Sequence, residues 1–160
     1  MKKATTLFLK IAVIFIGIPI LVLCIFLVPE IGDMAAKLLP EFASIKYVVF
    51  FVFYVSTVPF YFALYQAFNL LRFIDKNRAF SEVSVMALKK IKYCAIAISS
   101  FHVLILPLFY LFADQDDAPG VVFVGLVVPF ASMVIAVFAA VLQRLLQEAI
   151  HIKSENDLTV

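Results

Sequence analysis

The chain has 160 residues, of which 65 % are hydrophobic and 15 % charged, and its formal net charge is +2. Soluble domains are roughly 45–50 % apolar and about 25 % charged, so this composition excludes a soluble globular protein and indicates a membrane chain. The net charge is also too small to suggest direct nucleic-acid binding, and two cysteines are too few ligands for a metal site.

The first predicted element is a membrane span. Residues 11–28 form an uncharged run that is longer than the core of a secretory signal, and no small-residue cleavage site follows it. We expect an uncleaved span that enters from the cytoplasm beside Lys10. In the connector that follows, residues 29–46, Asp33 is placed to cap a short helix over residues 34–39, which we expect to lie along the outer membrane surface.

Residues 47–71 carry no charge and are long enough to cross a hydrocarbon core of about 30 Å. At about 100° per residue, one face of this second span collects an aromatic stripe, which consists of Tyr47, Tyr54, Tyr61, Tyr65 and Phe68. Phenol hydroxyls in hydrocarbon need partners. The stripe is therefore expected to hydrogen-bond to other helices or, alternatively, to line a ligand groove.

The central loop, residues 72–92, carries six basic residues against two acidic ones. Short loops rich in Lys and Arg stay on the cytoplasmic side of the membrane. Ser81 is expected to cap a helix that runs on into the third span. Lys89, Lys90 and Lys92 are expected at the membrane surface, where they bind anionic lipid or, alternatively, a cytoplasmic partner.

The third span, residues 93–112, places His102 near its middle. An ionisable side chain at that depth is a functional hypothesis, and even a neutral imidazole needs a hydrogen bond. His102 and Tyr61 come to similar depth, so we expect them on facing helices with His102 held by a hydroxyl, or else in a proton-sensing or transport role. The candidate intramembrane polar site consists of His102, Tyr61, Tyr54 and Ser99.

An acidic outer turn and a fourth span complete the chain. Asp114, Asp116 and Asp117 in the turn 113–120 do not match the spacing of a calcium loop, and we expect them to keep the turn in water. The fourth span, residues 121–142, returns to the cytoplasm. Its amphipathic pattern predicts that the helix continues past the membrane, so residues 143–160 form a cytoplasmic extension and tail.

The predicted fold is an all-α membrane protein, a single four-transmembrane-helix bundle over residues 1–160, embedded in the bacterial cytoplasmic membrane. This topology places eleven basic residues inside and two outside. Both termini are therefore expected in the cytoplasm.

Three short motifs resemble those of the YoaS-like family of unknown function, which consists of small four-span bacterial membrane proteins. They are Asn77-Arg78-Ala79-Phe80-Ser81, Leu88-Lys89-Lys90-Ile91 and Glu155-Asn156-Asp157-Leu158-Thr159-Val160. The resemblance covers nearly the whole chain, although Ala79 stands where the family often has a proline. Members are often encoded beside a small cytoplasmic helix-turn-helix regulator, so the resemblance implies a membrane partner for a transcription factor.

We therefore expect a regulatory protein that binds a cytoplasmic partner. The candidate docking residues are Asn77, Arg78, Phe80, Ser81, Asn156, Asp157 and Leu158. The alternative is a small transporter, efflux component or self-immunity protein, which has to form a homo-oligomer because four spans seldom enclose a pathway alone. No enzyme and no cofactor are expected, since the chain has neither an HExxH nor a GxSxG motif.

Overall fold

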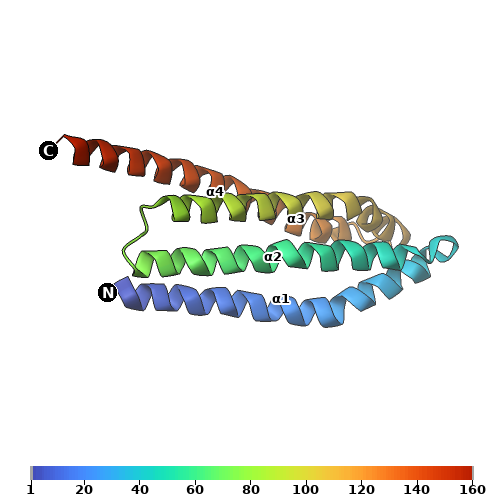
Figure 1. Cartoon of the computed structure of the whole chain (residues 1–160). Helices are drawn as coiled ribbons and strands as arrows, with labels where there is room; N and C mark the ends of the chain where they lie inside the picture. The colour runs from blue at the N-terminus through green and yellow to red at the C-terminus, as the bar shows by residue number, and fades with distance from the viewer. Residues whose placement is uncertain (1, 160) are drawn as a thin grey trace.

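The computed structural model describes residues 2–159, which form four long α-helices joined by short connections (Figure 1). The helices are α1 (Lys2–Leu38), α2 (Ile45–Asp75), α3 (Glu82–Gln115) and α4 (Gly120–Leu158), and the short 3-10 helix η1 (Pro40–Phe42) lies between α1 and α2. Each of the four is long and apolar enough to cross a membrane. The all-α class and the four candidate spans are confirmed.

Helix α1 is longer than the predicted first span. It continues through Asp33 to Leu38, so the separate surface helix capped by Asp33 is wrong. Figure 1 shows α1 bending in its second half, where Pro29 lies, because proline removes a backbone donor and kinks a helix without ending it here. Beyond the bend, Ala35 is fully buried with residues of α2 and α3, and this packing favours the helical continuation.

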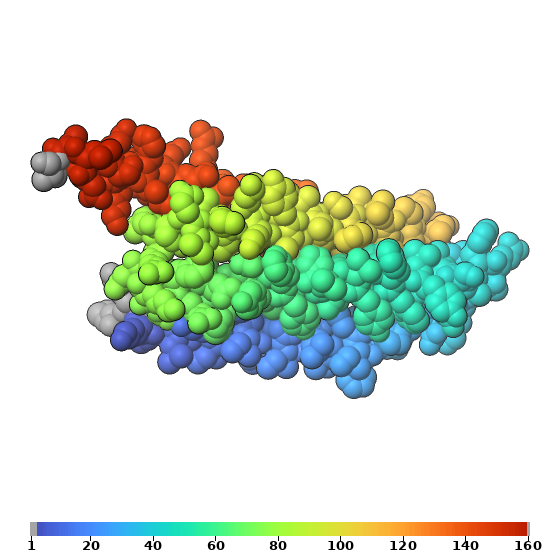
Figure 2. All heavy atoms as spheres, in the orientation of Figure 1, coloured from blue at the N-terminus to red at the C-terminus, as the bar shows by residue number. Residues whose placement is uncertain are grey.

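The helices pack in chain order. α1 packs on α2, α2 on α3 and α3 on α4, while α1 reaches α3 only through a minor contact. Within residues 2–159, α4 makes no comparable contact with α1 or α2. The expected four-helix bundle is therefore an open row that does not close on itself, and Figure 2 shows α1 and α4 at its opposite edges.

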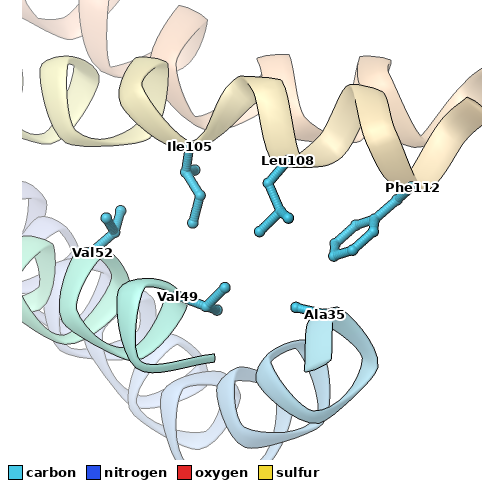
Figure 3. Packing of buried hydrophobic residues seen from close by; sticks show 6 residues of the cluster. All are labelled: Ala35, Val49, Val52, Ile105, Leu108 and Phe112. Carbon is cyan, nitrogen blue, oxygen red and sulfur yellow. The ribbon is translucent and has the colours of Figure 1, made fainter. Parts of the chain in front are cut away.

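The two ends of the row differ. Figure 1 shows both termini and the α2–α3 connection at one end, and η1 and the α3–α4 turn at the other. Near the second end, α1, α2 and α3 share an apolar core (Figure 3), which consists of Ala35, Val49, Val52, Ile105, Leu108 and Phe112.

The α3–α4 pairing is the most extensive in the molecule. Mostly small residues make up the buried face of α4, which consists of Gly125, Pro129, Ser132, Ala136 and Ala139. Small side chains let two helix backbones approach closely in a membrane. A Cβ added at Gly125 would lie 2.7 Å from Cγ of Phe109 on α3, so this position leaves no room for a side chain.

Candidate functional site

The α2–α3 connection is a tight turn that backbone hydrogen bonds hold in place. Asn77 adopts the left-handed conformation with φ of 57°, which asparagine tolerates better than most residues. The Arg78 N–H donates to the Phe73 carbonyl at 2.8 Å, and the Asn77 N–H donates to the Ile74 carbonyl at 3.1 Å. Helices commonly end with this arrangement. It fixes the direction in which the chain leaves α2.

Two serine hydroxyls hold the other side of the turn. Ser81 Oγ donates to the Arg78 carbonyl at 2.6 Å, and Ser84 Oγ donates to the same carbonyl at 3.2 Å. Ser81 occupies the N-cap position of α3 as predicted, but its side chain makes no capping hydrogen bond because the hydroxyl is directed to Arg78. Ser84, which is completely buried, was not predicted; its position three residues after Ser81 is the signal that was available.

This turn presents an arginine and an aromatic ring to the surroundings. Arg78 is exposed, and Phe80 is 61 % exposed although it is apolar. Val83, one turn into α3, is also exposed. Further exposed basic residues surround the turn, namely Arg72, Lys76, Lys89 and Lys90. The connection is thus a cationic surface that includes an uncovered aromatic side chain.

The other predicted docking residues lie on α4. The helix extends to Leu158, further than expected, and Asn156, Asp157 and Leu158 are all exposed on its last turn. Within the described residues no hydrogen bond or ion pair joins them to the turn at 77–81, and Figure 1 shows the end of α4 diverging from the α2–α3 connection. Val160 lies outside the described residues. The two predicted parts of the docking surface are therefore at the same end of the molecule but separate.

Two contacts between neighbouring helices mark the edge of the apolar region at this end. The Lys10 ammonium of α1 pairs with the carboxylate of Asp75 at the end of α2. Lys92 Nζ of α3 donates to Gln143 Oε1 of α4 at 3.3 Å. We call these four residues the polar belt. Asp75 lies beyond the predicted second span, and hydrogen bonds from Lys10 and Thr6 lower the pKa of its carboxyl.

His102 lies inside the helix row, 6 % exposed, without a hydroxyl partner. Its Nδ1 is 2.9 Å from the carbonyl of Ile98 on the same helix, and its ring packs edge-on against Phe53 of α2 with the centroids 5.3 Å apart. Ser99 Oγ instead donates to the Pro129 carbonyl of α4 at 3.0 Å. Both side chains therefore serve helix packing.

The tyrosines of the predicted site face α1. Tyr61 Oη donates to the Gly17 carbonyl at 2.7 Å, and Tyr54 Oη donates to the Cys24 carbonyl at 3.3 Å. His102 and Tyr61 lie on neighbouring helices as predicted, but the predicted hydroxyl contact is wrong, because His102 packs at the level of Phe53, eight residues from Tyr61, and Tyr61 turns toward α1. Tyr61 also lines a shallow apolar groove of about 360 Å³ between α1 and α2.

The acidic turn has a structural role. Asp117 takes the left-handed position after α3 with φ of 48°, and the Ala118 N–H donates to the Ala113 carbonyl at 2.9 Å. Within residues 2–159, no group of three or more His, Cys, Asp or Glu side chains is gathered closely enough to hold a metal ion.

The sequence of this chain is similar to one family of proteins. The family described as "Protein of unknown function (DUF2975)" matches residues 30–160. The chain is 65 % identical over 160 residues to the "Uncharacterized membrane protein YoaS" of Bacillus subtilis (strain 168), and the match covers 100 % of both chains. No solved structure matches. This multi-pass bacterial membrane protein therefore belongs to the DUF2975 family.

Proposed function

We propose that this protein is a regulatory membrane protein that binds a small cytoplasmic helix-turn-helix transcription regulator. The observation that carries the proposal is the fixed turn that keeps Arg78 and Phe80 exposed. Arginine and aromatic residues are enriched among the side chains that dominate binding energy. Because the turn is already ordered, binding costs less conformational entropy there. The role proposed is interaction without catalysis.

The distribution of charge supports a cytoplasmic location for this surface. Of the 13 Lys and Arg residues, only Lys37 and Lys46 lie toward the end that carries η1 and the α3–α4 turn. The other eleven lie toward the end that carries both termini and the α2–α3 connection. Basic residues in short loops are retained on the cytoplasmic side, so this asymmetry favours the second end as the cytoplasmic one.

The chemistry of the turn specifies the partner's surface. Exposed cations around Phe80 attract acidic residues, and the ring needs an apolar pocket to leave water. A face of the regulator that combines a small apolar pocket with an acidic rim fits both requirements. This face is distinct from a basic DNA-binding face, so the regulator can be held without occupying its DNA contacts.

The transporter alternative has less support. The polar side chains on which it depends are used for packing: His102 lies against Phe53, and Tyr61 donates to a carbonyl of α1. We therefore do not propose transport.

The test measures how strongly the protein, held in neutral-lipid nanodiscs, binds the purified helix-turn-helix regulator that is encoded beside it. Phe80→Ala and Arg78→Ala are each expected to weaken the affinity at least about tenfold, since truncating a hot-spot residue costs about 2 kcal/mol or more and tenfold in affinity corresponds to about 1.4 kcal/mol. Phe42→Ala is the matched control, because Phe42 is an equally exposed ring (67 %) at the opposite end of the molecule.

A second variant tests whether the order of the turn matters. Ser84→Ala keeps Arg78 and Phe80 but removes a buried hydroxyl from the Arg78 carbonyl, so it should weaken capture less than Phe80→Ala does. A tail variant, Leu158→Ser, tests whether the end of α4 contributes. Capture that neither Phe80→Ala nor Arg78→Ala reduces would contradict the proposal.

A further inference from the structure

We infer that α4 pairs with α4 of a second copy of this chain, as a parallel coiled coil around a two-fold axis along the membrane normal. The first observation is the part of α4 beyond the polar belt. After Gln143, which Lys92 holds against α3, the helix continues for 15 residues to Leu158. That is about 22 Å of helix at 1.5 Å per residue. Figure 1 shows α4 diverging from the other helices toward its C-terminus, with its end extending past them.

The projecting segment carries an apolar stripe that no other part of the chain covers. Leu142, Leu145 and Ile152 are 51 %, 56 % and 65 % exposed, and Ala149 between them is only partly covered. Their spacing of three, four and three residues is the repeat of a coiled-coil seam. The stripe continues into the apolar part of α4 with Phe138, four residues before Leu142, which is 65 % exposed.

The stripe is separate from the face that packs on α3. That buried face runs through Ser132, Ala136 and Ala139 to Gln143, and lies about 160° around the helix from the line through Leu145 and Ile152. A second helix can therefore seat on α4 without displacing α3. Lipid chains can cover the stripe within the bilayer, but beyond the polar belt the same side chains face water and favour a protein partner.

The flanking charges complement a second copy of the same helix. If Leu142 and Ala149 are a positions and Leu145 and Ile152 are d positions, Glu148 falls at g and Lys153 at e. In a parallel pair, a g residue lies beside the e residue five positions later on the partner helix, so Glu148 meets Lys153 of the second copy. Both are exposed; the present Glu148 contact, 3.4 Å to Arg144, is a surface pair worth little.

The next a position is Asn156, which is exposed. A single buried asparagine at an a position selects register and a two-stranded state at some cost in stability.

The orientation of the chain in the membrane supplies the last constraint. Two copies inserted in the same orientation present their α4 helices in parallel, and an isologous contact between them closes as a dimer. The regulator is not needed for this contact, so the inference goes beyond the proposed function and does not depend on it.

Cysteine cross-linking in isolated native membranes tests the pairing. Leu145→Cys and Ile152→Cys are introduced singly into a Cys24→Ala, Cys94→Ala background whose helix content is checked by circular dichroism. Oxidation should give several-fold more disulfide-linked dimer from these two variants than from Gln147→Cys and His151→Cys, which are exposed on the opposite side of the same segment. Linkage at both identical positions requires parallel, in-register helices, because an antiparallel pair brings only the residue at its crossing point beside its own copy.

A charge exchange tests the partner's identity. In the Leu145→Cys background, Glu148→Lys should lower the dimer yield because it places a cation beside Lys153 of the second copy, and adding Lys153→Glu should restore the yield. Both variants lose the contact with Arg144, so restoration reports the contact between copies. Equal cross-linking at Gln147→Cys, no restoration by the double exchange, or cross-links to a different protein in place of the second copy would overturn the inference.

Discussion

At the scale of single residues, a close approach between α3 and α4 lies at Gly125 of α4. An added Cβ would be 2.7 Å from Cγ and 3.1 Å from Cβ of Phe109, so rotation of the ring alone does not relieve the clash. Gly120, the first residue of the same helix, has no atom within 4 Å of its added Cβ. These two glycines therefore form a matched pair for testing the α3–α4 packing.

Gly125→Ala is expected to destabilise the protein relative to Gly120→Ala. Overpacking of a tight contact costs about 1–3 kcal/mol, while the lower backbone entropy of alanine acts in both variants. Thermal unfolding in detergent, followed by circular dichroism, measures the difference. An equal or higher midpoint for Gly125→Ala would show that α3 and α4 are not packed as closely as described.

Individual side chains were harder to predict than helices. The prediction that His102 needs a partner was sound, but its partners proved to be the Ile98 carbonyl and the Phe53 ring. Tyr61 lies about 12 Å further along α2 than Phe53 and donates to α1. Which side of a helix meets which neighbour depends on the packing of the whole row, and a hydropathy pattern with apolar residues on all sides does not contain that information.

At the scale of elements, α1 depends on a few polar contacts with α2. Its apolar residues surround the whole helix, and most of them are exposed. The pair of Lys10 with Asp75 at one end and the Tyr61 and Tyr54 hydrogen bonds along the helix fix how α1 lies on α2. The charged pair predicts a pH dependence.

The contribution of Asp75 to stability is expected at neutral pH and not in acid. Hydrogen bonds from Lys10 and Thr6 lower the pKa of Asp75 in the folded protein, below the value of about 3.9 in an unfolded chain. The unfolded state therefore takes up the proton first as the pH falls. The stabilisation is complete well above pH 4 and is lost as the pH falls through the folded pKa.

Thermal midpoints of the wild type and Asp75→Asn measure this effect. The wild type should be the more stable at pH 7, and the difference should shrink toward zero as the pH is lowered from about 5 toward 2. Asp114→Asn, an exposed aspartate at the opposite end, controls for general effects of removing a carboxylate. A difference for Asp75→Asn that persists unchanged in strong acid would refute the role given to the pair.

Helix existence was predictable from uncharged runs, but helix ends were not. The spans predicted at 11–28 and 121–142 are parts of α1 and α4. Helix α1 continues through charged residues on both sides of its apolar run, and α4 continues through charged residues on the C-terminal side. Hydropathy reports how much helix fits in hydrocarbon, whereas the actual ends depend on turns and packing. Ala35 illustrates the point, since its burial against α2 and α3 lies beyond the predicted span.

At the scale of the whole molecule, the four helices form an open row, whereas a four-transmembrane-helix bundle was predicted. Short connections made sequential neighbours predictable. Whether the row of helices closes was not predictable, because closure requires a contact between α1 and α4. The apolar pattern of neither helix specifies such a contact. The uncovered outer face of α4 is what makes pairing with a second copy feasible, and the end with both termini is where we propose that the regulator binds.

The most direct test of this account is the side of the membrane on which the two ends lie. In the Cys24→Ala, Cys94→Ala background, Phe80→Cys in the α2–α3 connection and Asp116→Cys in the α3–α4 turn are treated in intact cells with a membrane-impermeant maleimide. If the end with both termini is cytoplasmic, Asp116→Cys is labelled in intact cells and Phe80→Cys only after permeabilisation. Labelling of Phe80→Cys from outside, with Asp116→Cys protected, would contradict the proposed cytoplasmic docking surface.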